Sequence, residues 1–167
     1  MVFLLYTIAT MTANKELLDR IAAEEAELVL DHFTEDDAWK LGLLLVEAAR
    51  KNGGPIALDI RRPGQILFHA AMPGAVGDND EWIRRKTNVL FRFRKSSFAV
   101  GVNLGLIGQT VEEKYNISSA EYATHGGAFP ICVKGAGLVA ALTVSGLAQE
   151  DDHAMAVECL RRLKAKS

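Results

Sequence analysis

The sequence predicts a single α/β domain, of the α+β kind, in which helices flank a five-stranded antiparallel sheet. Two pairs of β-rich segments are each joined by a short glycine-containing turn, and such hairpins favour antiparallel pairing. Segments with the periodicity of amphipathic helices stand before, between and after the two pairs. The chain has 167 residues, 49% hydrophobic and 24% charged, which suits one globular domain with its own core.

We divide the chain into an N-terminal extension, residues 1–13, and a single domain, residues 14–167. Residues 2–8 are mostly apolar, yet the first basic residue is Lys15, and the run is far shorter than the roughly 20 residues of a membrane helix. We therefore predict neither a signal peptide nor a membrane anchor. Two interpretations stay open: an edge strand of the sheet, or an extension upstream of a chain that starts at Met11. We prefer the second.

The first half of the domain is predicted to contain two helices and a short strand. A helix over residues 14–24 is followed by a strand over residues 27–30. The clearest helix begins after Thr34, whose hydroxyl can cap it, and acidic residues fill its first turn. It ends at the Asn-Gly-Gly-Pro sequence of residues 52–55. Because this helix is apolar on most sides, we expect it to lie centrally or to contact another subunit.

A hairpin follows, with strands over residues 56–61 and 65–71 around a turn at Pro63 and Gly64. A two-residue turn divides the side chains between two faces: Ile56, Leu58, Ile60, Leu67 and His69 on one, and Asp59, Arg61, Ile66 and Phe68 on the other. Both faces carry apolar residues, so the sheet is expected to be covered on both sides.

The remaining elements are predicted as a helix over residues 78–93 that continues over 96–106, broken or joined near Ser96-Ser97, and a turn of helix around 118–123. A hairpin of 130–134 with 138–145 and a helix over 149–164 follow. The turn of helix is inferred from a capping box formed by Ser118 and Glu121. Residues 135–140 fit the letters of a dinucleotide-binding fingerprint. A β-rich run rather than a helix follows them, so we interpret them as a hairpin turn.

Composition argues against several classes of partner. The net charge is -2 and the isoelectric point about 6.1, so the whole protein does not attract nucleic acid or an anionic membrane. A basic stretch from Arg84 through Lys86 to Lys95 could meet phosphate groups, and we interpret it as the solvated face of a helix. Cys132 and Cys159 form no C-x-x-C motif and are expected to be reduced and buried, which indicates a cytoplasmic protein.

His125, Gly126 and Gly127 are the leading ligand-binding candidates. Glycine amides can cradle an anion, and His125 could serve as an axial ligand or an acid–base group. The alternative is a glycine turn that leads into a strand. Asp59 and Arg61 are further candidates because they are charges in an otherwise apolar hairpin. There they pair with each other or with a neighbouring element, and the pair is either structural or lines a polar pocket.

Two other histidines are assigned structural places. His69 is expected to be a hydrogen-bonded residue of the sheet, and His153 a solvated residue in the first turn of the last helix. No two of the four histidines have the spacing of a metal site, so no metal is predicted.

A set of ordered segments runs through nearly the whole chain, from about Lys15 to Leu163. It includes His125 to Ile131, Val139 to Val144, Ser145-Gly146 and Asp151 to Ala154, and before them Ile60-Arg61-Arg62, Leu67-Phe68-His69, Pro73-Gly74 and Asp78 to Lys86. Together these segments resemble the haem-degrading HbpS-like, or GlcG-like, family, and more closely its uncharacterised cytosolic branch. The resemblance implies a profilin-like fold, assembly into homo-oligomers and, for some relatives, binding or degradation of haem.

Three hypotheses about function follow. The leading one is a cytosolic, oligomeric binding or scaffold protein whose pocket takes haem or another small ligand. A rival is an enzyme acting on a small carboxylate or an oxidised metabolite, with His125 as acid–base group and the Gly126 and Gly127 amides and Arg61 as anion holders. The third is a protein-interaction module that uses the apolar helix around Trp39 to Val46. No complete catalytic constellation is visible, so the sequence does not decide whether the chain is an enzyme.

Overall fold

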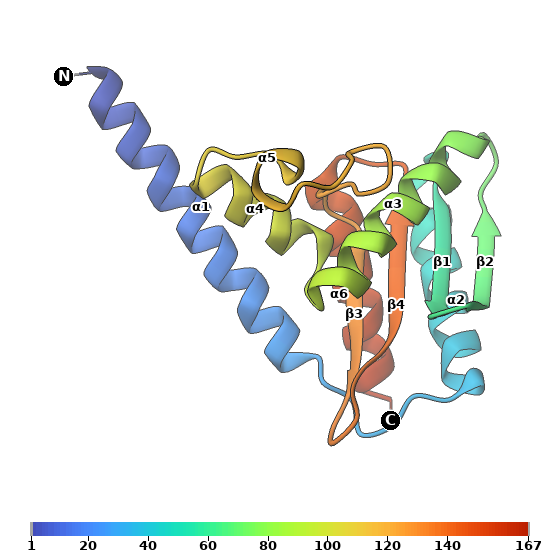
Figure 1. The fold of residues 1–167 in the computed structure, drawn as a ribbon. Helices are drawn as coiled ribbons and strands as arrows, with labels where there is room; N and C mark the ends of the chain where they lie inside the picture. Colours follow the sequence, from blue (N-terminus) through green and yellow to red (C-terminus); the bar gives the residue numbers. More distant parts are fainter. Residues whose placement is uncertain (1, 167) are drawn as a thin grey trace.

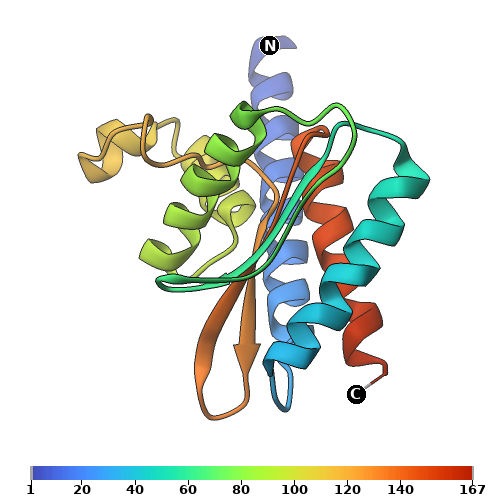
Figure 2. The same ribbon diagram turned by 90° about the vertical axis from the view of Figure 1, so that its right-hand side faces the viewer.

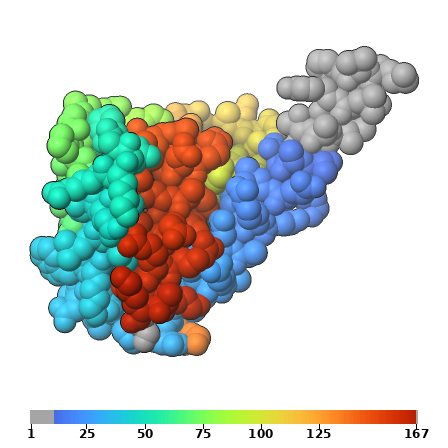
Figure 3. Space-filling view, turned by 180° about the vertical axis from the view of Figure 1, so that it is seen from behind, coloured from blue at the N-terminus to red at the C-terminus, as the bar shows by residue number. Residues whose placement is uncertain are grey.

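A four-stranded antiparallel sheet lies between two layers of helices (Figures 1 and 2). The computed structural model describes the backbone of residues 2–166 and the side chains of residues 11–166. Its elements are α1 (Val2–Glu27), α2 (Glu35–Asn52), β1 (Ala57–Arg62), β2 (Gln65–Ala71), α3 (Gly77–Phe93), α4 (Ser97–Leu106), α5 (Val111–Tyr115), β3 (Ala128–Val133), β4 (Gly137–Ser145) and α6 (Gln149–Lys164). The helices α2 and α6 cover one face of the sheet, side by side as Figure 3 shows, and α3 and α4 lie on the other.

The two predicted hairpins join through their inner strands, in the order β2-β1-β4-β3. The strands β1 and β4 pair antiparallel, from Ala57 opposite Ser145 to Arg61 opposite Ala141. The prediction of one common sheet, covered on both faces, is therefore confirmed. The junction also fixes the chemistry near the end of β4, because residues from β4, α3 and the start of α6 meet there.

The fifth strand predicted over residues 27–30 is wrong. Helix α1 continues to Glu27, and Leu30 makes only an isolated parallel bridge to Val133. The Leu30 N–H donates to the Cys132 carbonyl at 2.8 Å, and the Leu30 carbonyl accepts from the Lys134 N–H at 2.9 Å. Since the chain between α1 and α2 is short, it satisfies these two backbone groups at the sheet edge without adding a strand.

The first hairpin has the predicted turn but a different register. Arg62 pairs with Gln65 and Arg61 with Ile66, and then Ile60 pairs with Phe68, so Leu67 is an extra residue in a β-bulge. A shift of one residue moves every later side chain to the other face. His69 therefore lies opposite Asp59 rather than Leu58, and the face assignment given by a regular two-residue hairpin is wrong.

The main core lies between the sheet and the α2–α6 layer. Its fully buried members from the strands and helices include Leu41, Leu45, Leu58, Ile60, Phe129, Ile131, Leu142 and Leu160. The opposite face of the sheet is more polar. Asp59 is fully buried there, and the Thr143 hydroxyl lies 2.9 Å from the Thr87 hydroxyl of α3. This polar side of the sheet is the one that faces the candidate site.

Helix α2 is capped as the sequence predicts. The Asp37 N–H donates to the Thr34 hydroxyl at 3.2 Å, and Asp37 accepts from the Thr34 N–H at 2.9 Å. The turn of helix predicted around Ser118 is present as a single hydrogen-bonded turn, in which the Ser118 carbonyl accepts from the N–H groups of Glu121 and Tyr122 at 3.0 Å and 3.1 Å. The predicted capping box is wrong, since Glu121 pairs with Arg84 at 2.6 Å. A real capping box instead begins α5, where Thr110 and Glu113 cap each other.

Helix α1 runs unbroken from Val2 to Glu27, so the predicted edge strand near the N-terminus is wrong. An apolar stripe of α1, Leu17, Leu18 and Ile21, packs against Phe98 and other residues of α4. Met1 and the side chains of residues 1–10 lie outside the described residues. The division at residue 13, and the choice of Met1 or Met11 as the start, stay predictions.

Candidate functional site

His125 lies in the segment that leads into β3 and packs against α3. Its ring stands edge-on to the Trp82 indole, with 5.1 Å between centroids, and the Arg85 guanidinium lies 4.1 Å from the Trp82 ring centre. The histidine side chain is exposed, and neither ring nitrogen has a hydrogen-bond partner among residues 11–166. It is therefore available to a ligand.

Two cavities flank His125. The first has a volume of about 300 Å³ and lies between α3, the end of β4 and the start of α6. It is lined by Asp78, Asn79, Trp82, Lys86, His125, Ser145, Gly146, Leu147, Gln149 and Asp152. The second, of about 380 Å³, lies toward α4 and α5 and includes Arg85 and Tyr122 in its lining. We call the first of these the His125 cavity.

A buried ion pair forms the floor of the His125 cavity. The Lys86 ammonium donates to Asp152 at 2.8 Å and to the Val144 carbonyl at 3.2 Å. Asp152 also accepts from the Leu147 N–H at 3.0 Å. The two charged side chains are 4% and 2% exposed, so both charges are almost completely removed from water. Buried pairs of this kind beside a cavity are frequent at functional sites.

The sequence interpretation of Lys86 as part of a solvated basic face is wrong. Lys86 lies three residues after Ile83 and four before Leu90, both buried, so it occupies the inner stripe of α3. A lysine at such a position is the signal that could have revealed the site. Burial lowers the pKa of Lys86 and raises the pKa of Asp152, and each charge opposes the effect on its partner.

Gly126 and Gly127 allow the backbone to approach the rest of the site. A Cβ on Gly126 would lie 2.1 Å from the Gln149 carbonyl oxygen, and one on Gly127 would lie 2.3 Å from that of Val144. Gly127 also has a φ of +131°. The Gly126 N–H donates to the Gln149 side-chain oxygen at 3.4 Å, so it has a partner within the protein. These glycines position His125 and the cavity floor.

Electrostatics favour a neutral His125. Burial lowers the pKa of His125, and the positive charges of Lys86 and Arg85 lower it further. A neutral imidazole offers one N–H donor and one acceptor nitrogen. Near pH 7 this side chain can therefore accept a proton or a hydrogen bond from a ligand.

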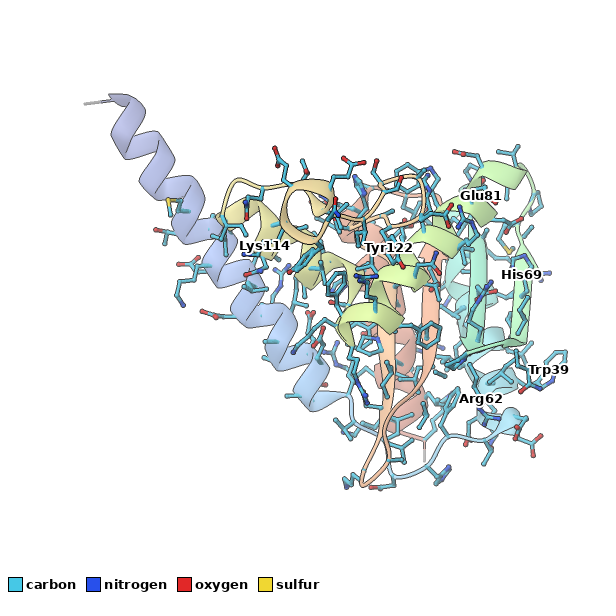
Figure 4. The ribbon with its side chains drawn as sticks, viewed as in Figure 1. Trp39, Arg62, His69, Glu81, Lys114 and Tyr122 are labelled. Atoms are coloured by element: carbon cyan, nitrogen blue, oxygen red, sulfur yellow. The ribbon has the colours of Figure 1, made fainter. Side chains whose placement is uncertain are left out.

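Asp59 and Arg61 lie in a separate charged cluster on β1. Arg61 donates two hydrogen bonds to Asp59, at 2.5 Å and 2.8 Å. His69 lies 3.2 Å from Asp59 through Nδ1 and 3.3 Å from Asp80 through Nε2. Asp59 and Arg61 line neither cavity beside His125. Of the two predicted alternatives, the structure shows the pairing, and His69 is the hydrogen-bonded sheet residue expected. Figure 4 shows His69 on β2.

Several other assignments change with the structure. His153 is buried rather than solvated, and its Nε2 lies 2.9 Å from Glu24 of α1. Cys159 is buried as predicted, but Cys132 is only half-buried. Other basic residues after Lys86 do remain at the surface, where Lys95 pairs with Glu25 at 3.1 Å. Gly135 and Gly137 form the predicted hairpin turn, both with positive φ.

Two features are absent from the described residues. No three histidine, cysteine, aspartate or glutamate side chains gather there in an arrangement that could hold a metal ion. Within the same residues, none of the helices has the length and hydropathy needed to span a membrane.

Comparison with known proteins agrees with the resemblance. The sequence model of the family described as "Haem degrading protein HbpS-like" matches residues 33–161. A UPF0303 protein of Streptomyces avermitilis is 49% identical over 157 residues, which cover 94% of this chain and 96% of the relative. The crystal structure of the Ybr137w protein is 40% identical with a TM-score of 0.84, covering 89% of this chain and 88% of that one. The crystal structure of a PduOC:Heme complex shares the fold, with 17% identity and a TM-score of 0.64. The match covers 77% of this chain and 93% of that one.

Proposed function

The chain belongs to the HbpS-like family of haem-degrading proteins, and from this premise we propose that it is a small-molecule binding protein whose ligand occupies the His125 cavity. The observation that carries the proposal is the buried Lys86–Asp152 pair beneath an exposed, unbonded His125. A buried ion pair often contributes little to stability, so its place beside a cavity supports a binding role.

Haem does not fit the His125 cavity well. His125 could supply an axial nitrogen, and Arg85 lies nearby as a cation. The cavity is nevertheless small, at about 300 Å³, and much of its lining is polar. A larger hollow of about 490 Å³ between α1, α3, α4 and α5 has partly apolar walls. Among the described residues, its lining holds no histidine, cysteine or methionine, but it includes Tyr115, and tyrosine ligates the iron of some haem proteins. His125, the imidazole candidate, lies instead at the more polar cavity. The proposal therefore favours a smaller, polar ligand.

One observation supports the rival hypothesis of an enzyme acting on a small carboxylate or an oxidised metabolite. His125 has the environment of an acid–base group, since burial and neighbouring cations lower its pKa. Arg61 pairs with Asp59 on another part of the sheet, so any anion holder belongs elsewhere. Turnover of a bound compound, rather than binding alone, distinguishes the enzyme from the binding protein.

Two titrations test the proposal. A library of small polar metabolites is screened by ligand-observed NMR, and hemin is followed through its Soret band. We expect metabolite hits that are lost in His125→Ala and kept in His32→Ala, a variant of an exposed histidine outside the cavity. The absence of any hit sensitive to His125→Ala contradicts the proposal. A saturable Soret shift that requires His125 would instead establish haem as the ligand.

Assembly and location complete the proposal. We propose a cytoplasmic homo-oligomer, supported by the apolar surface that α2 and β2 leave exposed. Trp39, Leu43 and Ile66 are 57%, 61% and 57% exposed, and Trp39 points away from the body of the molecule (Figure 4). The alternative use of this surface is a different protein partner.

A further inference from the structure

Most polar groups of the His125 cavity already have partners in the protein. Asp152 accepts from Lys86 and from the Leu147 N–H, and Asp78 accepts from the Trp82 indole at 3.1 Å. The Asn79 amide donates to the carbonyls of Ser145 and Pro55, and its oxygen accepts from the Val76 N–H. Asp152 is thus engaged by a cation and a backbone N–H, whereas Asp78, at the exposed rim, keeps acceptor capacity.

Three donors of the cavity lack a full set of partners among the described residues. Ser145 is only 4% exposed, yet its hydroxyl makes no hydrogen bond. The Lys86 ammonium has three N–H groups, of which two donate to Val144 and Asp152. The Gln149 oxygen accepts from Gly126, which leaves the amide N–H groups of Gln149 unpaired. None of these three groups is among the fully buried unpaired atoms, so they reach the cavity, where water or a ligand can pair them. Their free N–H and O–H groups favour a ligand rich in acceptors.

The charge balance of the cavity sets the charge of that ligand. Lys86 and Asp152 neutralise each other, and Asp78 of the same lining is an exposed carboxylate whose partner is the neutral Trp82 indole. A bound anion therefore adds negative charge that needs a new positive charge beside it. His125 can offset this charge by taking up a proton. Without a ligand, the positive charges of Lys86 and Arg85 lower the pKa of His125, and the negative charge of a bound anion would raise it. The single proton that His125 can take up balances the charge of a monoanion, but only half the charge of a dianion.

The other charged groups around His125 are held by partners. From α3, Arg85 lies over the Trp82 ring and Asp78 accepts from its indole. From α6, Asp152 is paired with Lys86. Glu112 of α5, in the lining of the second cavity, accepts from the Ser119 hydroxyl at 2.6 Å. His125 is thus the group at this site suited to change its charge near neutral pH.

We propose that the His125 cavity binds a small monocarboxylate, which accepts hydrogen bonds from Ser145, Gln149 and Lys86 while His125 takes up one proton. This inference rests on the proposed binding function and commits it to a ligand class. It also sets a pH dependence. Affinity for the carboxylate is highest where His125 can be protonated, and it falls as the pH rises above the histidine range.

The test uses acetate, lactate and benzoate as probes, with acetamide as a neutral match for acetate and inorganic phosphate as a competing oxyanion. Binding to the full chain is followed through the His125 ring resonances in a pH titration. We expect saturable binding of at least one carboxylate, a rise in the pKa of His125 on saturation, and no binding of acetamide. Ser145→Ala should weaken binding by roughly tenfold, the loss of one hydrogen bond to a charged group. Ser118→Ala, in an exposed turn outside the cavity, should not.

Each other outcome overturns the inference. Equal binding of acetamide would show that charge is not recognised, and tighter binding of phosphate would assign a different anion. If a carboxylate binds and leaves the pKa of His125 unchanged, the proposed uptake of a proton by His125 is wrong. If no carboxylate binds, but metabolites or hemin bind in a manner that requires His125, the carboxylate proposal is wrong and the proposed binding function stands. If none of these compounds binds, the carboxylate proposal and the proposed binding function are both wrong.

Discussion

At the scale of single residues, the Lys86–Asp152 pair joins two segments that lie 66 positions apart in the sequence. Lys86 comes from α3 and Asp152 from the first turn of α6, and their contact closes the floor of the cavity. The same Asp152 holds the Leu147 N–H, so the pair also fixes the loop between β4 and α6. The site and the fold therefore depend on the same two charges.

Replacing Lys86 by methionine should be strongly destabilising. The change leaves Asp152 buried without its cation, and breaking a buried pair from one side costs about 3–5 kcal/mol. The free energy of unfolding, measured by urea denaturation, should fall accordingly. The double variant Lys86→Met with Asp152→Leu should recover much of the loss, because neither charge is then left alone. Lys51→Met, in an exposed pair with Glu47, is the control and should change little. A single variant as stable as the wild type would contradict the role of the pair.

His153 makes the stability depend on pH. It is buried against Phe98 and Phe129, its Nδ1 has no partner among the described residues, and burial lowers its pKa from 6.5 despite the nearby Glu24. The unfolded chain therefore binds a proton at a higher pH than the folded protein does. Stability is greatest above pH of about 6.5 and falls as the pH drops through and below that value.

The comparison of the wild type with His153→Phe measures this effect. The free energy of unfolding is measured with urea from about pH 8 to about pH 5, a range that spans the titration of histidine. It should fall more steeply in the wild type than in the variant. Other groups titrate in both proteins, so the difference between the two curves isolates His153. Parallel curves would show that His153 does not contribute.

The sequence could identify His125, Gly126 and Gly127 as a unit, because a histidine between a polar segment and two glycines stands out locally. It could not pair Lys86 with Asp152 or bring Ser145 to them, since only the tertiary fold makes those contacts. The sequence also singled out Asp59 and Arg61, as charges in an apolar hairpin. It could not show that the two residues pair with each other, because that contact depends on the register of the sheet.

At the scale of elements, local signals succeeded where the chain satisfies its own backbone groups. The cap at Thr34, the glycine after α2 and the break between α3 and α4 at Arg94 and Ser96 all follow from neighbouring residues. The bulge at Leu67 does not, because the pairing of β1 with both β2 and β4 decides which side chains are buried. The failed capping box at Ser118 has a similar cause, since Arg84 of α3 binds Glu121.

The two capping sequences give a direct prediction. Thr34→Ala removes the side chain that caps α2, and the free energy of unfolding should fall by about 1 kcal/mol. Ser118→Ala also removes a hydroxyl that accepts a backbone N–H, from Ala120 at 3.1 Å, but it lies in an exposed turn that caps no helix, so the loss should be clearly smaller. Both are measured by urea denaturation at neutral pH. An equal loss in the two variants would mean that the Thr34 cap does not stabilise α2.

At the scale of the whole molecule, the sheet order places the charged cluster of Asp59 and the His125 cavity on the same side, beneath and beside α3. The opposite side carries the main core under α2 and α6. The candidate site and the main apolar core thus lie on different sides of the sheet, although the Lys86–Asp152 pair contributes to both the site and stability. The outer surface of α2 belongs to neither, and its exposed Trp39 and Leu43 need another explanation.

We propose that a second copy of the chain covers this surface, which makes a measurable prediction. Burial of Trp39 and Leu43, one turn apart on α2, would remove their exposed apolar area from water, which stabilises association by about 25 cal/mol per Å² of apolar area. Leu43→Glu would place a charge in that contact, so its oligomers should dissociate at a higher protein concentration than those of the wild type. Multi-angle light scattering across a dilution series measures the difference.

Ile107→Glu, which charges an exposed apolar residue at the end of α4, is the matched control and should assemble as the wild type does. A wild-type chain that is monomeric throughout would leave this surface to a different partner, and equal dissociation of both variants would show that added charge, rather than the α2 surface, is responsible.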